Sequence, residues 1–120
     1  MNKKTLVLGA SINPKRYSYI AVKRLLEHGI EVDALGNKNG EIFGVEINTS
    51  KELFEDIHTI TLYLSAKNQE NYYDYIVGLK PKRVIFNPGT ENLELERILN
   101  MNNILFERAC TLVLLSIGTY

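Results

Sequence analysis

The chain has 120 residues, of which 45% are hydrophobic and 23% are charged, a size and composition typical of one folded domain. Fourteen Lys and Arg balance fourteen Asp and Glu, which argues against a protein that coats nucleic acid, because neutralising phosphates needs excess positive charge. The single cysteine excludes an intrachain disulfide framework and a cysteine-rich zinc site, and it fits a reducing cytosol. No apolar run reaches the roughly 18 residues of a membrane helix, and the N-terminus lacks a signal-peptide pattern. We therefore expect one cytoplasmic domain over residues 1–120, with no membrane, nucleic acid or metal partner.

The first quarter of the chain predicts a strand followed by a helix. The apolar run at 5–8, stopped by Gly9, is typical of a buried strand. Apolar residues at helical spacing then predict a helix from about Pro14 to His28. Asn13 is a suitable N-cap for this helix, and proline is favoured in a first turn.

The next segments are less regular. A second strand is expected at 30–35, followed by a turn-rich loop at 36–40. Residues 41–47 predict a weak strand or an extended segment, and Ser50 is placed to cap a short helix over 51–54.

The second half of the chain continues the alternation. The segment 110–117 is apolar on every side, so periodicity alone does not decide between strand and helix, and we favour a helix. The expected strands lie at 59–64, 83–86 and 104–106, and the expected helices at 68–79, about 95–99 and 110–117.

This order predicts an α/β fold. Strands joined by crossovers of a dozen or more residues pair in parallel, with right-handed connections. The expected architecture is a doubly wound, mainly parallel sheet of about five strands with helices on both faces. Such sheets bind ligands beyond the carboxyl ends of their strands, which directs attention to the loops after Leu8, Leu35, Leu64 and Phe86.

The loop after the first strand has the features of an anion site. Gly9 permits a sharp turn, and the small Ala10 and Ser11 let a ligand approach the backbone and the positive end of the following helix. Lys15 and Arg16 in a first helical turn oppose the helix dipole unless an anion is bound; the alternative is that both are simply solvated. Residues 1–24 hold no acidic residue and six basic ones: Lys3, Lys4, Lys15, Arg16, Lys23 and Arg24. Tyr17 and Tyr19 are placed to stack on adenine or to pack.

Missing motifs narrow the class of ligand. The dinucleotide fingerprint G-x-G-x-x-G and the P-loop are absent, and no carboxylate follows the first strand as in a phosphoacceptor. The second strand ends in Leu35-Gly36-Asn37-Lys38, without the acid that NAD-binding proteins use for the ribose. Lys38 instead suits another phosphate. A nucleotide with more phosphate than NAD around its adenosine end remains, and coenzyme A, with a diphosphate and a 3′-phosphate, fits.

Three segments carry a family resemblance, in the same order and over nearly the whole chain. GASINPKRYS at 9–18, PKRVIFNPGTEN at 81–92 and ACTLVLL at 109–115 resemble the small, single-domain bacterial CoA-binding proteins. The fold of those proteins is similar to the CoA-binding domain of the succinyl-CoA ligase alpha subunit. The resemblance implies a Rossmann-like domain that binds CoA or an acyl-CoA, with no established catalytic activity.

Individual positions follow or depart from the family pattern. The phosphate-side motif is matched by Gly9, Ala10, Ser11, Arg16 and Ser18. Many relatives have a Val-Asn-Pro type of turn after the second strand, where this chain has Leu35-Gly36-Asn37-Lys38.

Two further segments are candidates for the site. Asn87-Pro88-Gly89 forms either a rigid turn or a wall facing the pantetheine or acyl arm. Cys110 is either a buried small hydrophobe or a thiol whose pKa is lowered at a helix N-terminus. No catalytic or metal-binding residue is expected. The candidate cofactor-binding residues are Gly9, Ala10, Ser11, Asn13, Lys15, Arg16, Tyr17, Ser18, Gly36, Lys38, Asn87, Pro88, Gly89 and Cys110.

Three functions remain. The favoured one is a non-catalytic CoA-binding or regulatory module. The second is an acyl-CoA or thiol-handling enzyme that uses Cys110, although no histidine or carboxylate is linked to that thiol by a motif. The third, a dinucleotide-dependent oxidoreductase, lacks both the glycine pattern and the ribose acid.

Overall fold

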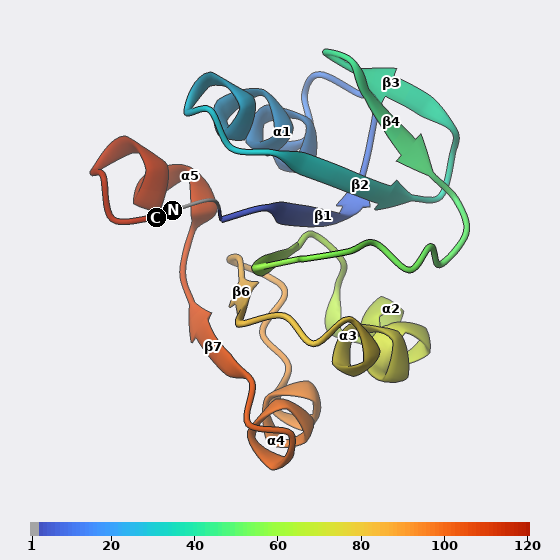
Figure 1. The fold of residues 1–120 in the computed structure, drawn as a ribbon, viewed down its shortest axis with the longest axis vertical. Helices are drawn as coiled ribbons and strands as arrows, with labels where there is room; N and C mark the ends of the chain where they lie inside the picture. The colour runs from blue at the N-terminus through green and yellow to red at the C-terminus, as the bar shows by residue number, and fades with distance from the viewer. Residues whose placement is uncertain (1–2) are drawn as a thin grey trace.

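The sheet runs through the middle of the protein, with helices packed on both of its faces (Figure 1). The computed structural model describes residues 3–120, so Met1 and Asn2 of the expected domain lie outside the described residues. Over that range the strands form one seven-stranded sheet in the order β3-β4-β2-β1-β5-β6-β7. The strands are β1 (Thr5–Ala10), β2 (Val32–Gly36), β3 (Gly40–Ile42), β4 (Val45–Asn48), β5 (Thr59–Leu62), β6 (Arg83–Phe86) and β7 (Leu105–Arg108).

Neighbouring strands pair in parallel, except that β3 and β4 form an antiparallel hairpin. The expected doubly wound α/β architecture is therefore confirmed. The expected number of about five strands is wrong, because the segment 41–47 is not one weak strand but part of this hairpin. Phe43 and Gly44 at its tip have φ values of 47° and 86°, and positive φ at both central residues is the geometry that a two-residue hairpin turn requires.

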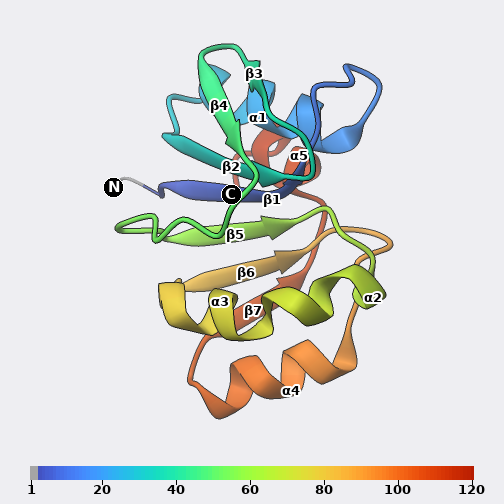
Figure 2. The ribbon, with the colours of Figure 1, turned by 90° about the vertical axis from the view of Figure 1, so that its right-hand side faces the viewer.

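Each face of the sheet has its own hydrophobic core, because successive side chains of a strand point to opposite faces. The helices α1 (Tyr17–Glu27) and α5 (Thr111–Ser116) contribute Val22, Leu25 and Leu115 to the core that contains Val7 of β1. The opposite face is covered by α2 (Ala66–Gln69), the 3-10 turn η1 (Glu70–Tyr72), α3 (Tyr73–Leu79) and α4 (Leu93–Met101), as Figure 2 shows for α3 and α4.

The helix after β1 starts later than expected. Asn13 and Pro14 lie in a turn before it, and Arg16 is its N-cap. The side-chain Oδ1 of Asn13 accepts a hydrogen bond from the backbone N–H of Lys15 at 3.0 Å, and its backbone carbonyl accepts from the N–H of Arg16 at 3.0 Å. Asparagine thus forms a local turn here, in competition with the helix.

Two other expectations need correction, and a third is confirmed. Residues 51–54 form no helix, and the Ser50 hydroxyl donates to Oε1 of Glu52 at 3.0 Å instead of capping one. The single helix expected at 68–79 is broken into α2, η1 and α3. The helix favoured at 110–117 is present as α5, but it is buried on one side only, since Val113 is 52% exposed.

Among the described residues, no helix is both long and apolar enough to cross a membrane.

Candidate functional site

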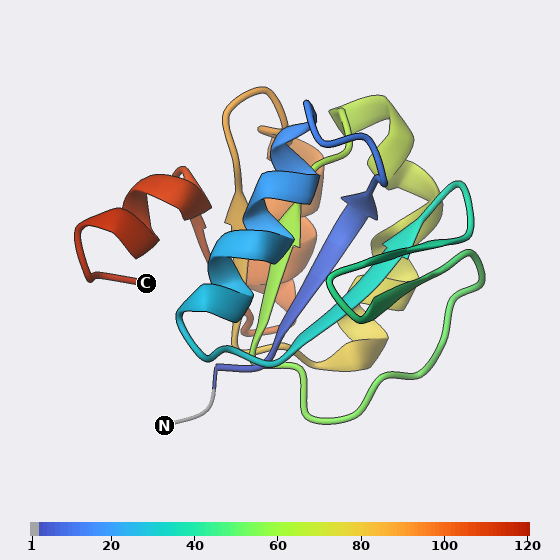
Figure 3. The ribbon, with the colours of Figure 1, turned by 90° about the horizontal axis from the view of Figure 1, so that it is seen from above.

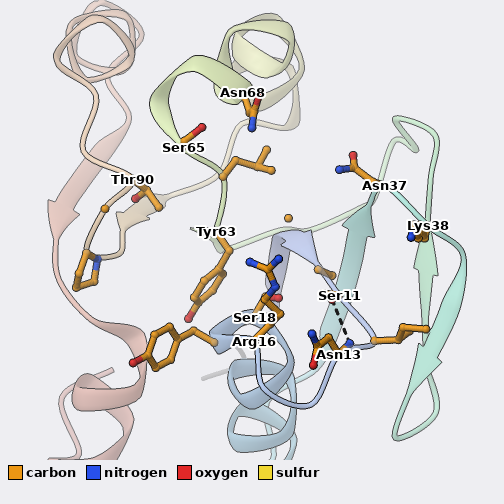
Figure 4. Close-up of a pocket in the computed structure, with 17 residues that line it drawn as sticks. Ser11, Asn13, Arg16, Ser18, Asn37, Lys38, Tyr63, Ser65, Asn68 and Thr90 are labelled. Atoms are coloured by element: carbon orange, nitrogen blue, oxygen red, sulfur yellow. Dashed lines mark hydrogen bonds between the residues drawn. The ribbon is translucent and has the colours of Figure 1, made fainter.

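The loops that follow four of the strands meet at one end of the sheet (Figure 3). The chain passes from β1 to β2 on one side and later to β5 on the other, so the strand order reverses between β1 and β5. A pocket of about 750 Å³ lies there, at the position where doubly wound sheets bind ligands (Figure 4). Its lining consists of Gly9 and Ala10 at the end of β1, Ser11, Ile12, Asn13, Arg16, Tyr17 and Ser18 after β1, Asn37 and Lys38 after β2, Tyr63, Leu64, Ser65 and Asn68 after β5, and Pro88, Gly89 and Thr90 after β6.

Two glycines let the strands end close together. Gly9 has a φ of +99°, and a Cβ there would lie 2.9 Å from the backbone carbonyl of Tyr63. A Cβ on Gly36 would lie 2.3 Å from the carbonyl oxygen of Ala10. Gly36 does not line the pocket but allows β2 to lie close to the end of β1, and its expected contact with the ligand stays a prediction.

The first loop presents an uncapped helix N-terminus. The Ser11 hydroxyl accepts from the N–H of Asn13 at 3.1 Å, which holds the loop in its turn. Arg16 provides no side-chain cap to α1, and no acidic residue lies in the first turn. Within residues 3–120, the backbone N–H groups of Tyr17 and Ser18 have no hydrogen-bond acceptor. The positive end of the α1 dipole is therefore uncompensated at the pocket.

The charge of the pocket has one sign. Arg16 and Lys38 are cationic, and none of the described residues in the lining is acidic. Lys15, expected to take part, lies outside the lining, although it is adjacent to Arg16 in the chain. The arrangement suits a ligand with phosphate groups, because charge-assisted hydrogen bonds and free N–H groups both favour anions.

The asparagine of the Asn87-Pro88-Gly89 turn has a structural role. Asn87 is buried, and its Nδ2 donates to Oγ1 of Thr61 at 2.7 Å and to the carbonyl of Leu62 at 2.9 Å. Its Oδ1 accepts from the N–H of Thr111 at 2.9 Å. Asn87 therefore joins β5, β6 and α5 and leaves the lining to Pro88 and Gly89, while its expected contact with the ligand stays a prediction.

The family model described as CoA binding domain matches residues 3–116. The chain belongs to this family. No curated protein matched the sequence. Three solved structures illustrate the likeness of the CoA binding domain to known folds. The crystal structure of an uncharacterised protein is 51% identical, with a TM-score of 0.97 over 100% of this chain and 99% of that chain. A hypothetical protein from Pyrococcus horikoshii is 26% identical, with a TM-score of 0.85 over 93% of this chain and 80% of that one.

A third likeness concerns the fold alone. The dinucleotide-forming acetyl-coenzyme A synthetase 1 of Candidatus Korarchaeum cryptofilum, solved with phosphate and ADP, is 16% identical, with a TM-score of 0.70. The match covers 88% of this chain and 25% of the synthetase, so this chain has the fold of one part of that larger protein.

Tyr63 is the most informative lining residue that the sequence did not identify. Burial raises the pKa of its phenol to about 12, although hydrogen bonding by Thr61 and Thr111 opposes the shift. The phenol is therefore protonated at neutral pH and is suited to donating a hydrogen bond. Of the two tyrosines considered for adenine stacking, Tyr17 lines the pocket, whereas Tyr19 packs on Phe43 with ring centroids 5.6 Å apart.

Cys110 lies outside the lining of this pocket, and its expected contact with the ligand stays a prediction. It is the N-cap residue of α5, is partly buried, and makes no side-chain capping hydrogen bond. Neither histidine lines the pocket: Nδ1 of His28 contacts the carbonyl of Arg24, and Nδ1 of His58 contacts Oγ1 of Thr59. Among the described residues, no three His, Cys, Asp or Glu side chains cluster in a way that would hold a metal.

Proposed function

We propose that residues 1–120 bind CoA or an acyl-CoA in this pocket, as a binding or regulatory module without chemistry of its own. The observation that carries the proposal is the pocket at the reversal of strand order, which combines two cations, an uncapped helix N-terminus and no acid among its described residues. Membership of the CoA binding domain family supports the same ligand.

We assign the diphosphate to the first loop and the 3′-phosphate to the side of Lys38. The N–H groups of Tyr17 and Ser18 and the guanidinium of Arg16 lie together at the start of α1, which suits the diphosphate. Lys38 follows β2, where a dinucleotide-binding protein carries its ribose acid, so this position favours a phosphorylated ribose over that of NAD.

The residues near the pocket support a role in binding more than in catalysis. A nucleophilic thiol needs a general base or a strongly cationic setting. Cys110 lies outside the pocket lining, and the described lining residues include no histidine. The phenol of Tyr63 has a pKa too high for general acid–base catalysis near neutral pH.

The experiment compares thermal unfolding with CoA, 3′-dephospho-CoA and NAD at equal concentrations. We expect CoA to stabilise most and NAD least; ligand at 100 times its Kd adds about 2.7 kcal/mol. Arg16→Gln should weaken CoA binding about tenfold or more, because a charge-assisted hydrogen bond contributes roughly 1.5–3 kcal/mol.

Lys15→Gln is the matched control. It also removes one positive charge, but the side chain of Lys15, the residue before Arg16, does not line the pocket. Its CoA affinity should stay within about threefold of the wild type at physiological salt. Stabilisation by NAD without any by CoA would refute the proposed function, and equal losses in the two variants would refute the role of Arg16.

A further inference from the structure

A buried glutamine connects two of the loops that form the pocket. Gln69, at the end of α2, has an exposed fraction of 0%. Its Nε2 donates to the carbonyl of Leu64 and to the carbonyl of Thr90, each at 2.8 Å. Leu64 follows β5 and Thr90 follows β6, and both line the pocket. One amide group therefore spans the two loops.

Asn92 fixes the orientation of this glutamine. Nδ2 of Asn92 donates to Oε1 of Gln69 at 3.0 Å and to the hydroxyl of Tyr73 at 2.9 Å. Oδ1 of Asn92 accepts from the N–H of Leu95 at 3.2 Å and so caps α4. Every polar atom of the Gln69 side chain thus has a partner, as a fully buried amide requires.

The same contacts determine which polar groups the lining after β5 and β6 leaves free to bind a ligand. The carbonyls of Leu64 and Thr90 are bound to Gln69, and the carbonyl of Asn87 accepts from both the N–H and the hydroxyl of Thr90, at 2.9 and 2.7 Å. The lining after β5 and β6 carries no charged side chain among its described residues, which are Tyr63, Leu64, Ser65, Asn68, Pro88, Gly89 and Thr90.

The beginning of α4 also disfavours an anion on this side. Oε1 of Glu91 accepts from the N–H of Gly89 at 3.0 Å, and Glu94 and Glu96 lie in the first turn of the helix. Glu96 is paired with Arg108 at 2.7 Å, and the carboxylates of Glu91 and Glu94 already compensate the positive end of the α4 dipole. Both cations of the pocket lie on the opposite side, after β1 and β2. This side therefore suits an uncharged, polar part of a ligand.

We infer that Gln69 and Asn92 are positioning residues that set the separation of the β5 and β6 loops, and that they determine the affinity of the pocket for the uncharged, amide-containing arm of CoA and not for its phosphates. The inference rests on the proposed function, because it assigns the two sides of the same pocket to the two ends of one ligand.

The test measures the Kd of CoA and of adenosine 3′,5′-bisphosphate, which lacks the arm, by calorimetry on the full chain. Gln69→Met keeps the length of the side chain and removes both hydrogen bonds to the loops. We expect its affinity for CoA to fall about tenfold while that for the bisphosphate changes by less than about twofold. A general loss of structure would weaken both ligands alike, so the ratio of the two affinities is the decisive readout.

Asn92→Ser is the second variant, and it serves if Gln69→Met does not fold. Serine retains an N-cap oxygen for α4 but loses the amide that contacts Gln69, so the same selective loss is expected. Asn102→Ser is the matched control: it removes an amide bonded at 2.8 Å to the carbonyl of Ile98 at the far end of α4 and should leave both affinities unchanged.

The outcomes separate the two proposals. Wild-type protein that binds neither CoA nor the bisphosphate overturns the proposed function. Wild-type protein that binds both, together with Gln69 and Asn92 variants that lose both equally or lose neither, overturns this inference alone.

Discussion

Gly9 turns β1 into the first loop, and both its backbone and its lack of a side chain are needed there. We predict that Gly9→Ala lowers the free energy of unfolding by roughly 2–4 kcal/mol, because the left-handed backbone is strained and the new Cβ meets the carbonyl of Tyr63. Urea unfolding measures the loss.

The control is Gly44→Ala, at a φ of +86° with no atom within 4 Å of the added Cβ. It should lose only the cost of the backbone strain, about 1 kcal/mol. Equal losses at the two positions would show that the contact with Tyr63 is unimportant.

Residues in contact with the pocket could be predicted where the backbone itself carries the signal. The first loop was recognisable because Gly9, Ala10 and Ser11 are small and lie where a buried strand ends. Tyr63 and Gln69 had no such signal, because an aromatic residue after a strand and a polar residue in a helix normally pack or face solvent. Their roles depend on which loops lie beside them, a tertiary property. Asn87 shows the converse case: its residue type and place suit a ligand contact, whereas the hydrogen bonds of its side chain are with β5 and α5, which the sequence does not reveal.

At the scale of the element, α1 begins without the cap that most helices have. Arg16 holds the N-cap position with an extended backbone, φ −82° and ψ 143°, and no side-chain hydrogen bond. Aspartate is among the best N-cap residues, so we predict that Arg16→Asp stabilises the ligand-free protein by about 1 kcal/mol. The same change should weaken CoA binding, because it replaces a positive side chain that faces the CoA phosphates with a negative one. Thermal unfolding with and without CoA measures both effects.

Lys15→Asp makes the same change of charge at a position that is not the N-cap. It should give a smaller gain in the ligand-free protein and a smaller loss of CoA binding. If Arg16→Asp lowered the stability of the ligand-free protein, the start of α1 would not be an uncompensated helix N-terminus that an anionic ligand stabilises.

Most elements could be predicted from the sequence because their apolar runs are bounded by turn residues. The strand at 83–86 agrees with β6, and the helix favoured at 110–117, which periodicity alone does not decide, agrees with α5. The β3–β4 hairpin could not be predicted, because its strands have only three and four residues. Its turn residues, Phe43 and Gly44, both have positive φ, and phenylalanine is unusual at such a position. The start of α1 was misplaced because asparagine before proline suits both an N-cap and a local turn.

At the scale of the whole molecule, we predict that acid lowers stability through His58. Burial lowers the pKa of this imidazole, and the positive charges of Arg83, Lys3 and Lys82 lower it further. The unfolded chain, with a His pKa of 6.5, therefore binds a proton before the folded protein does. Stability is retained above pH 6.5 and falls as the pH drops from there toward the lower pKa of the folded state.

Urea midpoints at neutral and mildly acidic pH measure this loss, and His58→Gln should reduce its size. The carboxylates titrate in both proteins, so the difference between the two pH profiles isolates the histidine. Identical profiles would contradict the assignment.

The sheet also ends in a particular way on each side. Its outermost strands, β3 and β7, have only three and four residues, and they carry exposed charges at Glu41, Glu107 and Arg108. Long, flat, apolar edges recruit strands from other chains and seed fibrils, whereas short and charged ones do so poorly. The hairpin that adds β3 and β4 therefore also protects the sheet from edge-to-edge aggregation, and Glu107 and Arg108 give the opposite edge the same protection.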